Sequence, residues 1–236
     1  SSSAIYGCPL SNPVNERTKP LPAEDYGRAK LAGEILCQQY NKKGLTSSIV
    51  RPRTILGSGR LGIFQILFEW VHQGLNIPVI NEGKNIYQFI HASDLVNACI
   101  MISKSEVAGT YNIGAENFGT MYDVISNLIK HSGSRSKIKS VSSGLTEKGM
   151  SITSKLGLSP LGSYHALMYG RSMYFDISHA KKKLNFRPVF SNNDMFIESY
   201  EWYCENREAI ISGKLGGSGH KSAMRQRILR LVPYFI

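Results

Sequence analysis

The stretch that decides the fold covers residues 22–57 and reads PAEDYGRAKLAGEILCQQYNKKGLTSSIVRPRTILG. Pro22 and the two acidic residues after it favour a first helical turn, because proline fits there and carboxylates interact well with the positive end of the helix dipole. Apolar or small residues then recur with helical spacing, at Tyr26, Ala29, Ala32, Ile35, Leu36 and Tyr40. Gly44 can end this helix. Residues 45–56 are rich in β-branched side chains and predict a strand whose pairing ends at Pro52.

The same alternation continues along the chain. We expect helices over about 63–73, 120–133 and 195–210, and strands over 109–114 and within 134–144. Thr120 and Asp123 have the spacing of a capping box at the start of the second of these helices. Residues 85–105 predict a short strand and then a helix capped by Ser93 or Asp94. Strands that alternate with helices predict an α/β fold with a mostly parallel sheet.

The composition narrows the classes of function. The 236 residues are 42% hydrophobic, which suffices for a packed core, and no stretch reaches the roughly 20 apolar residues of a membrane-spanning helix. The net charge of +11 suits an anionic partner, but the basic residues are spread out rather than aligned on one helix, which argues against nucleic acid. The four cysteines are scattered, which argues against a metal site or a disulfide framework and favours a cytoplasmic protein.

The strongest chemical candidate is YGRAK at residues 26–30. A spacing of four places Tyr26 and Lys30 on one face of a helix. A neighbouring ammonium stabilises a phenolate, which makes tyrosine usable as a general acid and base. A chain with 12 tyrosines contains this spacing readily by chance, so the pentad alone also fits an ordinary amphipathic helix.

The order of the surrounding motifs resembles the extended short-chain dehydrogenase/reductase family, which contains NAD(P)-dependent sugar epimerases, dehydratases and related reductases. The motifs cover residues 1 to about 205 and comprise SSSAIYG (1–7), the YGRAK pentad, RPRTILG (51–57), YQFIHASDLVNA (87–98), GTYNIG (109–114) and FDISHAKKKLNFRP (175–188). The resemblance implies the C-terminal part of a doubly wound, Rossmann-type sheet with a smaller α/β substrate-binding lobe, and SSSAIYG as the end of a strand.

The resemblance also implies a division of the chain. Residues 1–56 and 86–112 are expected to belong to the dinucleotide-binding domain, 57–85 and 113–210 to the substrate-binding lobe, and 211–236 to a linker and a basic amphipathic helix. The chain would correspond to the C-terminal two-thirds of a family member, with the pyrophosphate loop outside it. The pattern Gly57-x-Gly59-x-x-Gly62 would then be a loop near the substrate.

The family pattern assigns candidate roles to individual residues. It implies that Ser2, Tyr26 and Lys30 are the catalytic set, with Ser2 holding the reacting oxygen. It implies binding of NAD or NADP by Tyr26, Lys30, Pro52 and Arg53, and binding of a small-molecule substrate by Ser3, Thr54, Tyr87 and Gln88.

Two positions narrow the expected reaction and substrate. The sugar-nucleotide 4,6-dehydratases carry acidic residues where this chain has Ser3 and Ala4, so epimerisation or reduction is favoured. Many sugar epimerases have a phosphate-binding arginine where this chain has Tyr87, and tyrosine is not suited to bidentate phosphate recognition. Arg53, Arg60 or Arg171 could take the place of that arginine. Near Tyr87, we expect Asp94 to be a helix cap and His91 a packed residue rather than a catalytic pair.

Other interpretations stay open from the sequence alone. The same fold could serve a non-catalytic NAD(P)-sensing protein, or the chain could be an inert fragment that lacks the pyrophosphate loop. Helix 23–42 is one that family members often use for dimer contacts, so a homodimer is one expectation. The basic helix at 223–236 could lie on an anionic membrane, but docking on the protein is the favoured interpretation.

Overall fold

The computed structural model describes residues 1–105, 108–141 and 170–215. The expected helix at 223–236 lies outside these ranges. Within them, no helix combines the length and apolar character needed to cross a bilayer.

The described chain forms two compact units. Unit 1 contains residues 1–55, 87–118 and 172–192, and unit 2 contains the described residues within 56–86, 119–171 and 193–236. Residues 172–192, which the sequence-based division placed in the lobe at 113–210, thus cluster with unit 1. The reason is packing: Ala180 and Phe186 are buried in the same apolar cluster as Tyr111 and Ile113.

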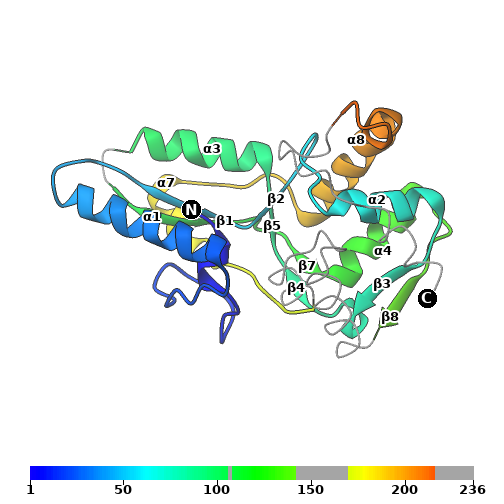
Figure 1. Ribbon diagram of the computed structural model, residues 1–236, viewed down its shortest axis with the longest axis horizontal. Helices are drawn as coiled ribbons and strands as arrows, with labels where there is room; N and C mark the ends of the chain where they lie inside the picture. Colours follow the sequence, from blue (N-terminus) through cyan, green and yellow to red (C-terminus); the bar gives the residue numbers. More distant parts are fainter. Residues whose placement is uncertain (106–107, 142–169, 216–236) are drawn as a thin grey trace. The chain divides into compact units, whose positions relative to one another are not determined.

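Two parallel strands form the centre of unit 1 (Figure 1). β1 (Ile49–Pro52) pairs with β6 (Thr110–Ile113), with Ile49 opposite Thr110 and Pro52 opposite Ile113. Pro52 ends β1, as its missing N–H predicts. The chain then continues as β2 (Thr54–Leu56), which pairs with β5 (Phe89–His91).

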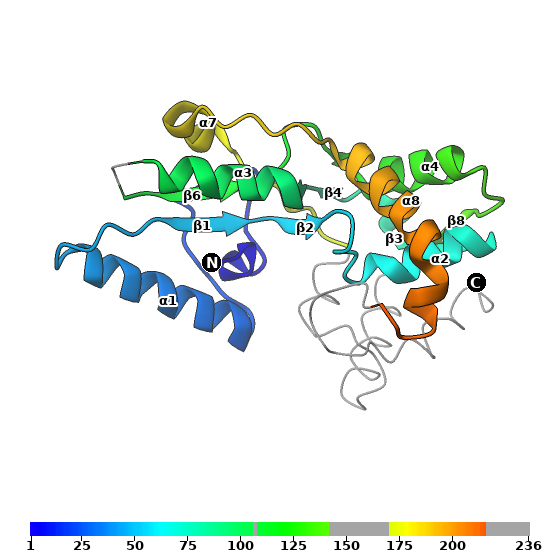
Figure 2. The same ribbon diagram turned by 90° about the horizontal axis from the view of Figure 1, so that it is seen from above.

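Helices cover both faces of β1 and β6. Val50 packs into the apolar cluster with α3 (Ala92–Ser103) and α7 (Ser178–Leu184). The next residue, Arg51, bonds instead to Glu34 of α1 (Asp25–Asn41). Because neighbouring residues of a strand point to opposite faces, α1 and α3 lie on opposite sides of β1, as Figure 2 shows. This layering confirms the predicted α/β fold.

Unit 2 is a smaller α/β assembly around a second parallel pair. β3 (Ile77–Ile80) pairs with β8 (Ile138–Val141). Around them lie α2 (Phe64–Gln73), η2 (Asn81–Gly83), β4 (Ile86–Tyr87), β7 (Gly119–Thr120), α4 (Met121–Ser132) and most of α8 (Asn192–Ile211). The α4 N-terminus carries the predicted capping box of Thr120 and Asp123. Helices α2 and α8 pack through Phe68, whose ring contacts Phe196, Tyr200 and Tyr203.

The predicted strand at SSSAIYG is wrong. Residues Ser3–Tyr6 form a 3-10 helix, η1. Ser2 has extended backbone and caps this helix, because its Oγ accepts the Ala4 N–H at 3.2 Å. Gly7 closes the turn from a positive φ of 55° by donating its N–H to the Ala4 carbonyl. The turn thus satisfies its backbone locally.

The predicted cap of α3 is also wrong. The cap residue is His91, whose Nδ1 accepts the Ser93 N–H at 3.2 Å. The Asp94 carboxylate instead accepts the backbone N–H groups of Val189 and Phe190, each at 3.1 Å. The His91 ring stacks on Phe190 at a centroid distance of 3.8 Å. These two side chains therefore hold the segment after α7 against α3.

Candidate active site

Tyr26 and Lys30 lie on the exposed side of the first turns of α1. Lys30 Nζ is 5.5 Å from the centre of the Tyr26 ring, as the spacing of four residues predicts. The Tyr26 side chain is 57% exposed, and Lys30 is exposed too. The phenol and the ammonium are therefore adjacent and accessible to a ligand.

Gly27 brings the start of α1 against the η1 turn that carries Ser2. A Cβ at Gly27 would lie only 2.6 Å from the Ala4 carbonyl oxygen and 3.0 Å from Pro22 Cβ, so only glycine permits this approach. Among the described residues, Ser2 and Tyr26 share no direct hydrogen bond. Because Ser2 Oγ accepts a backbone N–H, its own proton is left to donate to another group.

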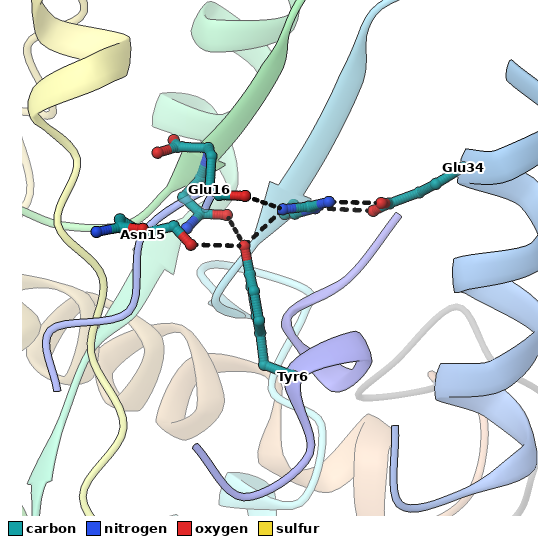
Figure 3. Close-up of polar contacts among 6 residues, drawn as sticks. Tyr6, Asn15, Glu16 and Glu34 are labelled. Atoms are coloured by element: carbon teal, nitrogen blue, oxygen red, sulfur yellow. Dashed lines mark hydrogen bonds and ion pairs between the residues drawn. The ribbon is translucent and has the colours of Figure 1, made fainter. Parts of the chain in front are cut away.

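A buried polar network connects η1, α1 and β1, and Figure 3 shows its members. Arg51 Nε and Nη2 donate to the two carboxylate oxygens of Glu34, at 2.9 and 2.6 Å. Arg51 Nη1 donates to the Tyr6 hydroxyl at 2.6 Å. Tyr6 donates in turn to Asn112 Oδ1 of β6 at 2.9 Å. The network therefore links the elements that carry Ser2, Tyr26 and Pro52.

The pKa values of Glu34 and Tyr6 in this network are shifted in opposite directions. Burial has the largest effect on Glu34 and by itself raises its pKa, but the hydrogen bonds and charges of Arg51 and of the Ser1 amino group together hold the pKa below its usual range. Burial is also the largest effect on Tyr6, and it raises the pKa of that phenol. Tyr6 therefore stays protonated and is no candidate for a general base.

Sequence reasoning missed this network, although two of its members lie in quoted motifs. Tyr6 belongs to SSSAIYG and Arg51 to RPRTILG, while Glu34 follows Lys30 by four residues in an otherwise exposed part of the helix. A partial signal was available, because a guanidinium buried in a short strand needs hydrogen-bond acceptors, but the sequence does not show which residues supply them.

The residues expected to bind substrate do not all have accessible side chains. Thr54 Oγ1 and Tyr87 Oη lie 3.0 Å apart and share a hydrogen bond, and both residues are partly exposed. Gln88 is fully buried: its Oε1 accepts the Phe175 N–H and its Nε2 donates to the Ala115 carbonyl. Ser3 is buried in η1. Gln88 therefore positions neighbouring segments rather than presenting a group to a substrate.

Pro52 and Arg53 follow the carboxyl end of β1, the edge where ligands bind in such sheets. The backbone here has acceptors to offer rather than donors, because Pro52 has no N–H and Arg53 donates its N–H to Ile113 at 2.9 Å. A carboxamide NH₂ is a donor that suits these carbonyls, and the Lys30 ammonium suits ribose hydroxyls. The chemistry of these groups, taken one by one, suits a nicotinamide nucleotide.

The Arg53 side chain is the least expected feature of the site. It is only 2% exposed, and its Nε donates to the Gln88 carbonyl at 3.1 Å. Both Nη atoms are buried, and neither has a hydrogen-bond partner among the residues that the structure describes. Sequence reasoning assigned Arg53 to the site through its backbone and did not predict this side-chain environment.

Comparisons with known proteins agree with the sequence motifs. Residues 1–114 match the model of the NAD dependent epimerase/dehydratase family. The chain is 55% identical over 235 residues to "Uncharacterized protein y4nG" of Sinorhizobium fredii, which covers 99% of this chain and 59% of that protein. It is 26% identical over 221 residues to UDP-glucuronate 4-epimerase of Thermodesulfobacterium geofontis, covering 91% of this chain and 61% of the relative.

Solved structures share the fold. UDP-glucuronic acid 4-epimerase from Bacillus cereus in complex with NAD gives a TM-score of 0.68 at 23% identity, over 87% of this chain and 60% of that one. RMD from Pseudomonas aeruginosa complexed with NADPH gives 0.66 at 15% identity, over 86% and 64%. These structural matches confirm the Rossmann-type fold, while the family-model match over residues 1–114 supports the predicted resemblance. The chain spans 59% of y4nG and 61% of the epimerase from T. geofontis.

Proposed function

We propose, from the premise that residues 1–114 carry the motifs of the NAD-dependent epimerase/dehydratase family, that the intact protein containing this chain is an NAD(P)-dependent epimerase or reductase. Its substrate would be a sugar nucleotide or a related small molecule that reacts at a hydroxyl or carbonyl carbon. The observation that carries the proposal is the exposed Tyr26–Lys30 pair at the start of α1, beside the turn capped by Ser2.

Each of the three side chains has a distinct task in this proposal. Tyr26 takes the proton from the substrate hydroxyl at its phenolic oxygen and returns it to the product. Lys30 stabilises the phenolate and holds ribose hydroxyls. Ser2 donates its hydroxyl proton to the reacting oxygen, while one lone pair of its Oγ accepts the Ala4 N–H. Lys30 and the backbone at Pro52 and Arg53 would hold NAD(P), which would supply the hydride chemistry when bound.

The side chains around Ser2 support epimerisation or reduction over dehydration. Ser3 and Ala4 have no ionisable acid, and both are buried in η1. Elimination of water needs a group that protonates the leaving hydroxyl, and neither residue can supply one. The relatives named as UDP-sugar epimerases support a sugar-nucleotide substrate. The scattered cysteines favour a cytoplasmic location.

The variant Tyr26→Phe tests the proposal. We expect turnover of UDP-glucose or UDP-glucuronate by the intact protein to fall at least about 100-fold, because the phenolic oxygen that moves the proton is gone. The matched control is Tyr40→Phe, which removes an exposed hydroxyl from the same helix and should leave turnover unchanged.

Turnover by Tyr26→Phe within about threefold of wild type would remove Tyr26 from the acid–base role. Binding of NAD(P) without turnover of any substrate by the wild-type protein would favour the NAD(P)-sensing function instead. Cofactor binding by calorimetry and product formation by NMR therefore separate the two functions.

A further inference from the structure

Arg53 and Arg51 lie two positions apart and are both buried, but their side chains are bonded very differently. Arg51 uses its guanidinium nitrogens for a two-point ion pair with Glu34 and a bond to Tyr6. Arg53 Nε donates to the Gln88 carbonyl. Within the described ranges 1–105, 108–141 and 170–215, the two Nη atoms of Arg53, which carry four N–H groups, have no acceptor.

The surroundings of Arg53 supply aromatic rings rather than acceptors. The guanidinium carbon is 4.6 Å from the centre of the Tyr87 ring and 5.5 Å from that of Phe175. The Tyr87 hydroxyl is engaged by Thr54, and Gln88 Oε1 by the Phe175 N–H. Cation–π contacts hold the plane of a guanidinium but leave its N–H groups unsatisfied.

A buried guanidinium without hydrogen-bond acceptors costs folding free energy. Proteins therefore retain one mainly where a bound ligand, ion or water supplies the acceptors. The planar fork of two Nη atoms matches the paired oxygens of a phosphate or a carboxylate. Both Nη atoms are buried. A phosphate or carboxylate can therefore reach them only as part of a ligand that displaces the side chains packed over the guanidinium.

We propose that Arg53 is an oxyanion-binding residue, whose two Nη atoms bind a phosphate or carboxylate group of the substrate. This inference rests on the proposed function for the nature of the substrate. Tyr87 stands where many sugar epimerases have a phosphate-binding arginine. The Arg53 guanidinium lies over the Tyr87 ring and would therefore supply a guanidinium at the same place. The two sources of the oxyanion, a nucleotide diphosphate and a sugar acid, are separable by experiment.

The test compares Arg53→Met and Arg53→Lys with wild type in the intact protein. Calorimetry measures the affinity for UDP, which has a diphosphate, for glucuronate, which has a carboxylate, and for NAD. Thermal unfolding without ligand measures stability. Arg17→Met is the matched control, because it removes the same charge from an exposed position of unit 1.

We expect Arg53→Met to weaken binding of UDP or of glucuronate at least about 30-fold, and Arg53→Lys to weaken it less. The unfolding temperature of ligand-free Arg53→Met should stay within about 2 °C of wild type or rise, because methionine fills the space without an unpaired charge. Arg17→Met should change neither quantity. Loss of UDP affinity would identify a diphosphate, and loss of glucuronate affinity a sugar acid.

The proposal is overturned if neither probe binds the wild-type protein, if Arg53→Met changes only NAD binding, or if it lowers the unfolding temperature while both affinities stay the same. The last result would mean that Arg53 serves only the packing of Tyr87 and Gln88. Because these measurements need no turnover, Arg53-dependent binding in a protein without epimerase or reductase activity would reject the proposed function and leave the oxyanion site standing.

Discussion

At the scale of single residues, the bond between Glu34 and Arg51 is the contact that joins α1 to β1. Both side chains are buried and their bonds are short, at 2.6 and 2.9 Å. A buried ion pair of this kind contributes little over a well-packed apolar pair, but loss of one partner leaves an uncompensated charge. The pair therefore fixes the position of α1 more than it adds to stability.

We predict that Glu34→Ala lowers the free energy of unfolding by about 3–5 kcal/mol, because Arg51 then has no carboxylate partner. The double variant Glu34→Leu with Arg51→Met should recover most of this loss. Urea denaturation at neutral pH measures both. Equal destabilisation by the single and the double variant would show that shape, not charge, holds α1 at this point.

The same pair predicts a dependence on pH. The pKa of Glu34 is lower in the folded protein than its usual value, so its contribution is complete above about pH 4.3, the unfolded value, and is lost as the pH falls through the folded value. The stability difference between wild type and Glu34→Gln should therefore shrink in acid. Glu82→Gln, in an exposed pair with Lys84, is the control and should show little difference at any pH. A difference for Glu34→Gln that does not vary with pH would contradict the prediction.

At the scale of elements, two glycines of α1 should respond in opposite ways to alanine. A Cβ at Gly33 meets nothing within 4 Å, so Gly33→Ala should stabilise the protein by about 0.5–1 kcal/mol through helix propensity. A Cβ at Gly27 meets the Ala4 carbonyl at 2.6 Å, so Gly27→Ala should destabilise by about 1–3 kcal/mol despite the same propensity gain.

Gly27→Ala should also lower turnover, because the added methyl group moves Tyr26 away from the turn that carries Ser2. Thermal unfolding and turnover of the two variants, measured side by side, test both statements. If Gly27→Ala is as stable and as active as Gly33→Ala, the close packing of α1 on η1 has no part in the site.

Periodicity and turn residues were sufficient to predict most of the elements. The helices α1, α2 and α4, the strands β1 and β6 and the Thr120 capping box all follow from local signals. The errors concern local alternatives of similar energy: Ser2 can cap a 3-10 helix as well as end a strand, and His91 can cap α3 from its ring nitrogen. Composition does not distinguish these choices. At α3 a distant contact adds to the difficulty, because the Asp94 carboxylate is engaged by the Val189 N–H.

Only part of the candidate site was predictable from the sequence. The motif spacing found Tyr26 and Lys30, and the structure brings them together. The pairing of Arg51 with Glu34 depends on a side chain from another segment, and so does the finding that the Arg53 Nη atoms have no acceptor among the described residues. The sequence shows that these arginines are present but not which of them has a partner.

At the scale of the whole molecule, the apolar residues of α1 are more exposed than their helical spacing suggests. The residues buried in α1 are Gly27 and Glu34, while Leu36 is 55% and Tyr40 53% exposed. Leu36 and Tyr40 are neighbours on the helix surface at a spacing of four, and Ile35 beside them is exposed as well. An apolar helix surface of this kind is typical of an interface between protein chains.

We therefore predict that the intact protein forms a homodimer through α1 and that Leu36→Glu converts it to a monomer, because two carboxylates would face each other in an apolar contact. Sedimentation velocity of the purified protein measures the change. Leu10→Glu, at a position that is 97% exposed and outside α1, is the control and should leave the dimer intact. A wild-type monomer, or a Leu36→Glu variant that stays dimeric, would show that this face of α1 is not the interface, and the exposure of Leu36 and Tyr40 would then need another partner.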